Sequence, residues 1–253
     1  RYTGGIHQQQ LAWIQNDLSM VPRDKLIVVM SHIEWTNIRH NDFGVLMEAL
    51  QPFDKVLGIT GHTHVTWHKH FDSAIGHGIE REHPIHLVVA TAACGRWWAG
   101  DHDYRGIPQS IQSDGVPNGY YILSVDGTDY TMHFKAAGRP WDYQMTIGSP
   151  RGELTQDELD NTTAVVNVFD GSEYSVVSYR IDDGEPVTME QVTGNDPLLG
   201  AIATPTPHLW SAPLPQGLSV GSHHITVTTT DQYGQSFSQS RVFEVLPAHE
   251  NEP

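Results

Sequence analysis

Apolar residues near the start of the chain alternate between helical and extended spacing. The pattern predicts an amphipathic helix over residues 8–18, a buried strand over 25–30, a second helix over 42–50 and a second strand over 55–60. Helices and strands alternate in this way in layered α/β folds, whose functional sites gather at the carboxyl ends of the strands. We therefore expect an α/β sheet with its chemistry where the strands end.

Both predicted strands end in histidine motifs. Ser31-His32 follows the first strand, and Gly61-His62-Thr63-His64 follows the second. A tight turn led by Gly61 can aim two imidazoles into one pocket, and His32 ends the neighbouring strand. Imidazole is a good ligand for zinc, iron and similar ions at neutral pH. The motifs favour a shared metal site, although the spacing by itself leaves open a set of surface histidines.

Beyond residue 64 the helical signal fades. Strands are expected over 65–71, 86–91, 119–125 and 130–135, the last two joined by an Asp126-Gly127 turn. Breaker residues predict an irregular loop over 94–118. From residue 162 onward, short strands at regular spacing predict an all-β, immunoglobulin-like sandwich. These strands are expected at 164–169, 176–181, 185–189, 222–229 and 240–245.

The charge also changes along the chain and indicates two domains. Residues 1–150 hold 11 Lys and Arg against 15 Asp and Glu, a net charge of −4, whereas 151–253 hold 3 against 15, a net charge of −12. Gly148, Pro150 and Gly152 suggest a linker near this change in charge. We predict a domain over 1–150, a linker over 151–161, the sandwich over 162–247 and a frayed tail over 248–253.

Composition excludes several classes of partner. The formal charge of −16 would repel nucleic acid and anionic membrane surfaces. The chain also lacks an apolar run of the roughly 18 to 20 residues that span a bilayer. We therefore expect no nucleic-acid partner and no membrane span. A single cysteine, Cys94, leaves the redox compartment open.

Histidine is crowded, because seven of the 16 histidines fall between residues 62 and 86. One reading is a metal-buffering protein that binds several ions through residues 68–86. The alternation with polar residues instead favours solvated side chains for most of the group. This expectation covers His68, His70, His77, His83 and His86.

The two strand-end motifs, at residues 28–33 and 59–65, resemble the later half of the calcineurin-like metallophosphoesterases. In that family a strand ending in a lone His precedes a strand ending in G-H-x-H. The stretches 94–100, 106–108 and 114–120 are similar to a bacterial subgroup with an extra carboxy-terminal domain. The resemblance covers nearly the whole chain, and it implies an extracytoplasmic location.

The resemblance implies a layered α/β sandwich of the metallophosphoesterase type, followed by the immunoglobulin-like domain. It further implies a dinuclear centre of manganese, iron or zinc that hydrolyses a phosphate ester. In that arrangement His32 and His62 would hold one metal and His64 the other. Arg96, Trp97 and Trp98 are candidates to bind the substrate beside the metal pocket, and the alternative for these side chains is to plug the loop.

The family's earlier half supplies D-x-H, a bridging G-D unit and G-N-H-[D/E], and none of these precedes His32. We therefore expect the chain to be the later half of the catalytic domain, with the amino-terminal half as its missing partner. No catalytic residue is assigned within it, and we expect the isolated chain to be inactive. The competing function is a non-catalytic binding module whose acidic β-sandwich docks to a partner.

Overall fold

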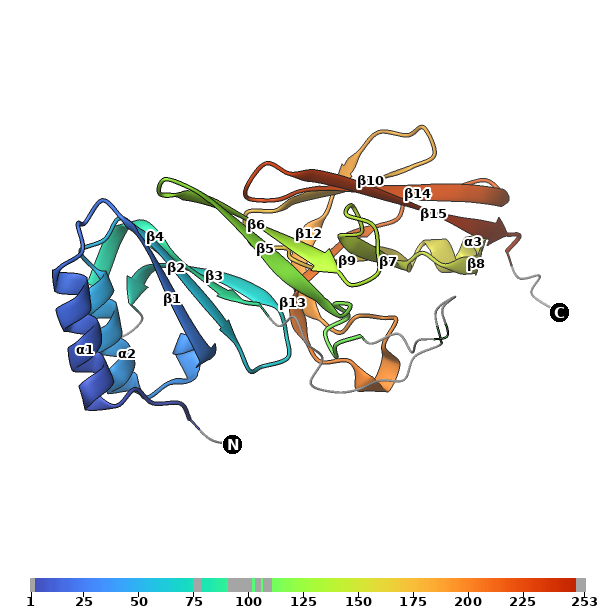
Figure 1. Ribbon diagram of the computed structural model, residues 1–253. Coiled ribbons are helices and arrows are strands. Elements are labelled where there is room, and N and C mark those ends of the chain that lie inside the picture. The colour runs from blue at the N-terminus through green and yellow to red at the C-terminus, as the bar shows by residue number, and fades with distance from the viewer. Residues whose placement is uncertain (1–2, 75–78, 91–101, 103–105, 107–110, 249–253) are drawn as a thin grey trace. The chain divides into compact units, whose positions relative to one another are not determined.

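A computed structural model describes residues 3–74, 79–90, 102, 106 and 111–248. The chain divides into two compact units (Figure 1). The first contains Arg1–Ala92 and Tyr121–His133, and the second contains Ala93–Tyr120 and Phe134–Pro253. Each unit has an apolar core of its own.

The first unit is a layer of helices on a mostly parallel sheet. Strands β1, β2 and β4 run parallel, β3 pairs antiparallel with β4, and the strand order is β1-β2-β4-β3. Figure 1 shows helices α1 and α2 side by side over this sheet. The predicted order of helix, strand, helix and strand is confirmed. The elements are α1 (Gln8–Ser19), β1 (Leu26–Ile33), a 3-10 turn (Trp35–Asn37), α2 (His40–Leu50), β2 (Lys55–Gly61), β3 (Trp67–Ala74) and β4 (Ile79–Val89).

The core of this unit lies between the helices and the sheet. Trp35, Leu46, Phe71 and Leu87 are all at most 2% exposed. Gly58 on β2 makes room for the indole, since a Cβ there would lie 2.7 Å from the Trp35 ring. This close packing holds β2 in the middle of the sheet.

A hairpin follows the long loop. Strands β5 (Gly119–Asp126) and β6 (Asp129–Ala136) pair with each other, and Gly127 in the turn has a positive φ of 63°, as the predicted Asp-Gly turn requires. The hairpin residues Tyr121–His133 group with the first unit.

The second unit is a sandwich of two sheets around one core that includes Val166, Tyr179, Trp210 and Ile225. The strand orders are β11-β10-β14-β15-β8 and β12-β13-β9-β7. The predicted all-β sandwich is confirmed, and its immunoglobulin type stays a prediction. Its elements are β7 (Met145–Ser149), β8 (Gly152–Thr155), α3 (Gln156–Leu159), β9 (Thr163–Val168), β10 (Val176–Ile181), β11 (Val187–Thr188), β12 (Glu190–Gly194), a 3-10 turn (Gly200–Ile202), β13 (Thr206–Pro213), β14 (Gly221–Thr230) and β15 (Ser236–Leu246).

The stretch 151–161, expected as a linker, is instead part of the sandwich. It contains β8 and α3, and β8 pairs in parallel with β15. Strand β7, inside the range expected for the first domain, pairs with β9. Of the residues that suggested a linker, Gly148 lies in β7, Pro150 lies between β7 and β8, and Gly152 begins β8 with a φ of 63°. Breaker residues mark such a turn as readily as a linker.

A buried polar network ties the segment before β5 to the sandwich. His208 Nε2 lies 3.3 Å from Asp114 Oδ2, and both side chains are fully buried. The other ring nitrogen of His208 lies 2.8 Å from Asn167 Oδ1. The Asn167 amide donates to the backbone carbonyl of Asp114 and to Asp196 Oδ2 at 2.8 and 2.7 Å. Buried polar groups of this kind stabilise a fold only while each keeps its partner.

A second polar cluster closes the turn after β10. His223 Nδ1 lies 2.6 Å from Asp182 Oδ2, and His223 Nε2 lies 2.8 Å from the Ser219 carbonyl. These two hydrogen bonds, that to Asp182 first, raise the pKa of His223 above its ordinary value. Burial raises the pKa of Asp182, but hydrogen bonds from His223 and from the backbone N–H of His224 outweigh burial and leave this pKa lowered.

We predict that Asp114→Ala lowers the free energy of unfolding of the second unit by about 2–4 kcal/mol. The substitution leaves the His208 ring nitrogen and the Val116 backbone N–H, which lies 3.0 Å from Asp114 Oδ1, buried without that partner. Denaturant unfolding measures the loss. The exposed turn variant Glu185→Ala should change this free energy by less than about 0.5 kcal/mol. Equal effects of the two substitutions would contradict the prediction.

The Asp182–His223 pair predicts a pH-dependent stability. A raised histidine pKa stabilises the fold below the unfolded pKa of about 6.5, and this contribution is lost as pH rises through the folded pKa. A lowered aspartate pKa stabilises the fold above about pH 3.9, and this contribution is lost as pH falls through the folded pKa. The pair therefore contributes most between about pH 4 and 6.5.

We expect His223→Gln to cost about 1–2 kcal/mol in that window, less than a fully buried charged pair because Asp182 is 39% exposed. The difference from the unmodified protein should shrink as the pH rises to 9. Thermal unfolding between pH 5 and 9 checks this, with the neighbouring exposed Asp183→Asn as the control. A difference that stays constant over this range would count against the charged pair.

Candidate functional site

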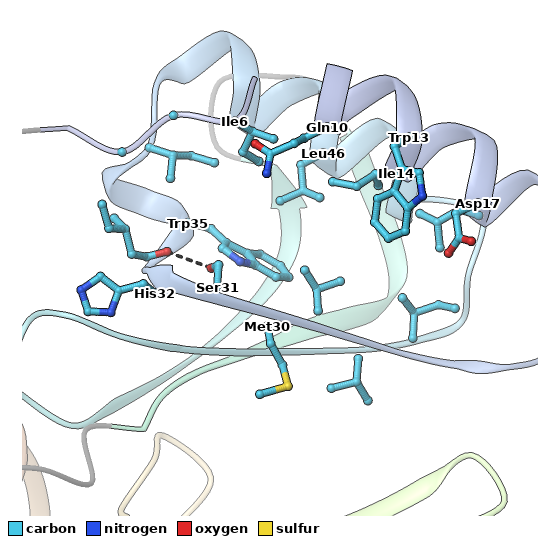
Figure 2. A pocket seen from close by; sticks show the side chains of 18 of the residues that line it. Ile6, Gln10, Trp13, Ile14, Asp17, Met30, Ser31, His32, Trp35 and Leu46 are labelled. Atoms are coloured by element: carbon cyan, nitrogen blue, oxygen red, sulfur yellow. Dashed lines mark hydrogen bonds between the residues drawn. The ribbon is translucent and has the colours of Figure 1, made fainter. Parts of the chain in front are cut away.

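The carboxyl ends of β1 and β2 meet, because the two strands are parallel neighbours. Met30 pairs with Ile59 and Ile33 with Gly61, so β1 contains one extra residue near its end. A bulge of this kind redirects side chains and often lies beside functional sites. The Ser31 hydroxyl donates to the Ile33 carbonyl at 2.9 Å and braces the bulge (Figure 2).

The two strand ends bring two imidazoles together. His62 Nδ1 lies 3.1 Å from His32 Nε2, and the rings meet edge to face with their centroids 5.0 Å apart. His32 is exposed and His62 is partly buried. The pair is therefore accessible from solvent.

The G-H-T-H turn is built from unusual backbone conformations. His62 and His64 have φ angles of 73° and 57°, in the left-handed region that residues with a Cβ rarely adopt. The Thr63 backbone N–H donates to the Gly61 carbonyl at 2.9 Å, and its hydroxyl donates to the Val65 carbonyl at 3.1 Å. A non-glycine residue in this region costs about 1–3 kcal/mol and is typical of functional sites.

His64 does not join the His32–His62 pair. Among the described residues, no group of three His, Cys, Asp or Glu side chains is arranged to hold a metal ion. Of the three histidines expected at one site, the structure thus brings two within contact of each other.

The separation of the His32 and His62 nitrogens would allow both to contact a single metal ion. Imidazole nitrogens lie about 2.0–2.1 Å from a bound zinc ion. Two nitrogens 3.1 Å apart could both lie within that distance of one ion. The donor set is neutral nitrogen, which suits zinc, iron or manganese. The pair can supply two ligands, about half of a tetrahedral site.

The candidates for substrate binding, Arg96, Trp97 and Trp98, lie outside the described residues. The same holds for His77. The structure describes residues 111–118 at the end of that loop, where Asp114 enters the buried network.

The expectation of solvated side chains, made for most of the crowded histidines, is wrong for His86. Its side chain is 3% exposed, its Nε2 lies 2.9 Å from His68 Nδ1, and its Nδ1 lies 2.8 Å from the Tyr130 hydroxyl. The His70 ring stacks on it at 4.3 Å. The signal available in the sequence was the position of His86 between the core residues Ile85 and Leu87.

Burial keeps the His86 side chain uncharged. Burial, and then the positive charges that His68 and His70 would carry, push the pKa of His86 far below its ordinary range. Burial also raises the pKa of the Tyr130 hydroxyl to about 12. The neutral His86–Tyr130 hydrogen bond joins β4 to β6, so we assign this cluster to the packing of the hairpin.

Comparisons with known proteins identify a family but support no statement about the fold. A comparison with curated proteins finds no match. CopC from Methylosinus trichosporium OB3b is 20% identical over 42% of this chain and 91% of its own, with a TM-score of 0.28. The PKD domain from the KIAA 1837 protein is 18% identical over 47% of this chain and 97% of its own, with a TM-score of 0.23. Scores this low support no argument about the fold.

None of the helices in the described part of the chain is long and apolar enough to cross a membrane. The profile of one family, described as the C terminal of calcineurin-like phosphoesterase, matches residues 88–237. The match covers more than half of the 253 residues and begins after His32, His62 and His64. The chain therefore belongs to the family of the C-terminal region of calcineurin-like phosphoesterases.

Proposed function

We propose that this chain takes part in metal-dependent hydrolysis of a phosphate ester, with its first unit as the later half of a calcineurin-like catalytic domain. The observation that supports this most directly is the His32–His62 pair at the ends of two parallel strands. The pair lies before the matched family region in the sequence. This is the order expected if a catalytic domain comes first and the C-terminal region follows it. The family's name supplies the phosphoesterase context.

In this proposal His32 and His62 hold one metal ion and His64 serves a second, each of them manganese, iron or zinc. When bound, two such ions would supply Lewis-acid stabilisation of the phosphoryl oxygens and a nucleophile derived from water at neutral pH. The chain's own contribution is to aim the imidazoles. The β1 bulge positions His32, and the left-handed backbone at His62 and His64 positions the others.

Within the described residues the ligand set is incomplete. Stable metal sites use about four donors, and the described part of the chain brings two imidazoles together. Bridging carboxylates and the acid that protonates the leaving group are therefore assigned to the amino-terminal half of the parent enzyme. We expect the isolated chain to bind one ion weakly and to lack turnover.

Substrate recognition is assigned to the long loop. Arg96, Trp97 and Trp98 lie within the matched family region. A guanidinium can pair with phosphate and flat rings can stack on a leaving group. The bacterial subgroup and the extracytoplasmic location are proposed on the same resemblance.

A second candidate function follows from the charge of the sandwich region. With 3 basic and 15 acidic side chains, residues 151–253 could dock to a basic partner. The first unit would then be a scaffold. Metal binding distinguishes the two candidates, because a scaffold does not require a metal ion at the His32–His62 pair.

We predict that Mn²⁺ or Zn²⁺ binds the isolated chain in a one-to-one ratio and that His62→Ala weakens this binding at least tenfold. The reason is the loss of one of two nitrogen donors. Titration calorimetry measures the affinity. His7→Ala, which removes an exposed histidine at the start of α1, is the matched control and should leave the affinity unchanged.

We also predict that the isolated chain with either metal does not hydrolyse an activated aryl phosphate, while the parent protein with its upstream sequence does. Loss of that activity in His62→Ala, with retention in His7→Ala, would support the proposal. Turnover by the isolated chain that disappears in His62→Ala would show that the site is complete without an upstream half. An inactive parent protein that binds no metal would favour the docking module.

A further inference from the structure

Two arginines lie together in the sandwich although that region of the chain is strongly acidic. Residues 151–253 contain three Lys and Arg against 15 Asp and Glu. Arg241 is on β15, and Arg151 immediately precedes β8, the parallel neighbour of β15. The first pair of these two strands is Phe243 with Gly152, so each arginine lies within two residues of it. Strand pairing thus brings two of the three positive charges to one place.

Arg241 is on the core-facing side of β15. Its partner across the sheet is Ile225, which is fully buried in the sandwich core, and directly opposed residues of antiparallel strands point to the same face. Strand β8 pairs with β15 from Phe243 onward, and no other described strand pairs with that edge. Arg241 is therefore partly buried at an open edge of the sandwich, which a small ligand can reach.

Within the described residues neither arginine has a carboxylate partner. The side chains of Arg151 and Arg241 make no ion pair and no hydrogen bond in this part of the chain. Burial, and then the positive charge of Arg151, lower the pKa of Arg241. Like charges placed together destabilise a fold, and partly buried charges are usually paired. The same region contains 15 acidic side chains, so a shortage of carboxylates does not explain the arrangement.

A tyrosine and a third guanidinium extend the cluster. Tyr143 lies near enough to Arg241 to raise the pKa of the guanidinium, against the two effects that lower it. The guanidinium carbon of Arg139 lies 5.4 Å from the centroid of the Tyr143 ring, which is a cation–π contact. The Tyr143 hydroxyl lies 3.2 Å from Thr146 Oγ1, a bond that fixes the ring. Three guanidiniums and one phenol thus form a single cluster.

The chemistry of this cluster selects a small oxyanion. A guanidinium presents its N–H donors in a planar fork that fits two oxygens of a phosphate, and a second guanidinium can bind the remaining oxygens. A bound dianion would also remove the repulsion between Arg151 and Arg241. The acidic surroundings repel large polyanions at long range, so a small phosphate is favoured over nucleic acid or an anionic membrane.

We propose that Arg151 and Arg241, with Arg139 beside Tyr143, form a binding site for a phosphate group at the edge of the sandwich. The ligand is inorganic phosphate or the phosphate group of a small ester, which present the same oxygens. All four residues belong to the second unit, and none of them is a proposed metal ligand. The inference therefore does not rest on the proposed hydrolysis.

NMR titration of the metal-free chain with inorganic phosphate, in the presence of a chelator, tests the proposal. At constant ionic strength, the Nε–H signal of Arg241 should shift and reach saturation. Chloride at the same ionic strength should cause no such shift, because it cannot bridge two guanidinium forks. Equal shifts with both anions, or shifts that never saturate, would overturn the proposal.

Substitutions locate the site. Arg151→Gln should weaken phosphate binding at least about tenfold, because one of two neighbouring guanidiniums is lost. Arg180→Gln is the matched control, since it removes the same charge from an exposed position on β10 of the same sandwich and should leave the affinity unchanged. Phosphate should also raise the midpoint of thermal unfolding of the unmodified chain and of Arg180→Gln, and have less effect on Arg151→Gln. Equal weakening in the two variants would overturn the proposal.

An aryl phosphate monoester distinguishes the two sources of the phosphate group. Tighter binding of the monoester than of inorganic phosphate, lost in Arg151→Gln, would identify a site for an ester, and weaker binding would identify a site for the free ion. If neither binds and Arg151→Gln self-associates, the arginines serve only to protect the open edge from pairing, and the proposal is wrong.

Discussion

The parallel pairing of β1 with β2 is the interaction on which the candidate site depends. It places two strand ends side by side, and the extra residue near the end of β1 then lets His32 reach His62. Without the pairing the two motifs, thirty residues apart in sequence, would have no reason to meet. Gly58 secures the pairing from the helix side, because its missing side chain admits the Trp35 ring over β2. A packing requirement in the core thus fixes the geometry of an exposed pair of imidazoles.

The first unit shows what a local pattern can predict. Helical and extended periods placed α1, α2, β1 and β2 within a few residues of their observed bounds, because the sequence of each element contains a regular stripe or run of apolar residues. The turn at Asp126-Gly127 followed from its chemistry in the same way. The position of the histidines at strand ends was visible for the same reason.

Features that depend on distant partners were not predictable in this way. Strands β8 and β13 were missed, since Gly and Pro residues bound both and what defines them is pairing with β15 and β9. The burial of His86 was not predictable, because its hydrogen-bond partner Tyr130 lies 44 positions later in the sequence. The left-handed backbone at His62 and His64 is likewise a feature that no spacing rule specifies. The substrate loop, lying outside the described residues, stays a prediction.

The buried network at Asp114 has a consequence for how such chains can be divided. Asp114 belongs to the segment before β5, while Asn167, Asp196 and His208 come from the sandwich strands and their loops. A recombination event that exchanged everything after residue 150 would separate this aspartate from all three partners and leave it buried against foreign side chains. The domain boundary suggested by charge and sequence pattern, near residue 150, is therefore not a boundary at which the chain can be recombined. Related proteins should exchange the segment that contains Asp114 and the sandwich together.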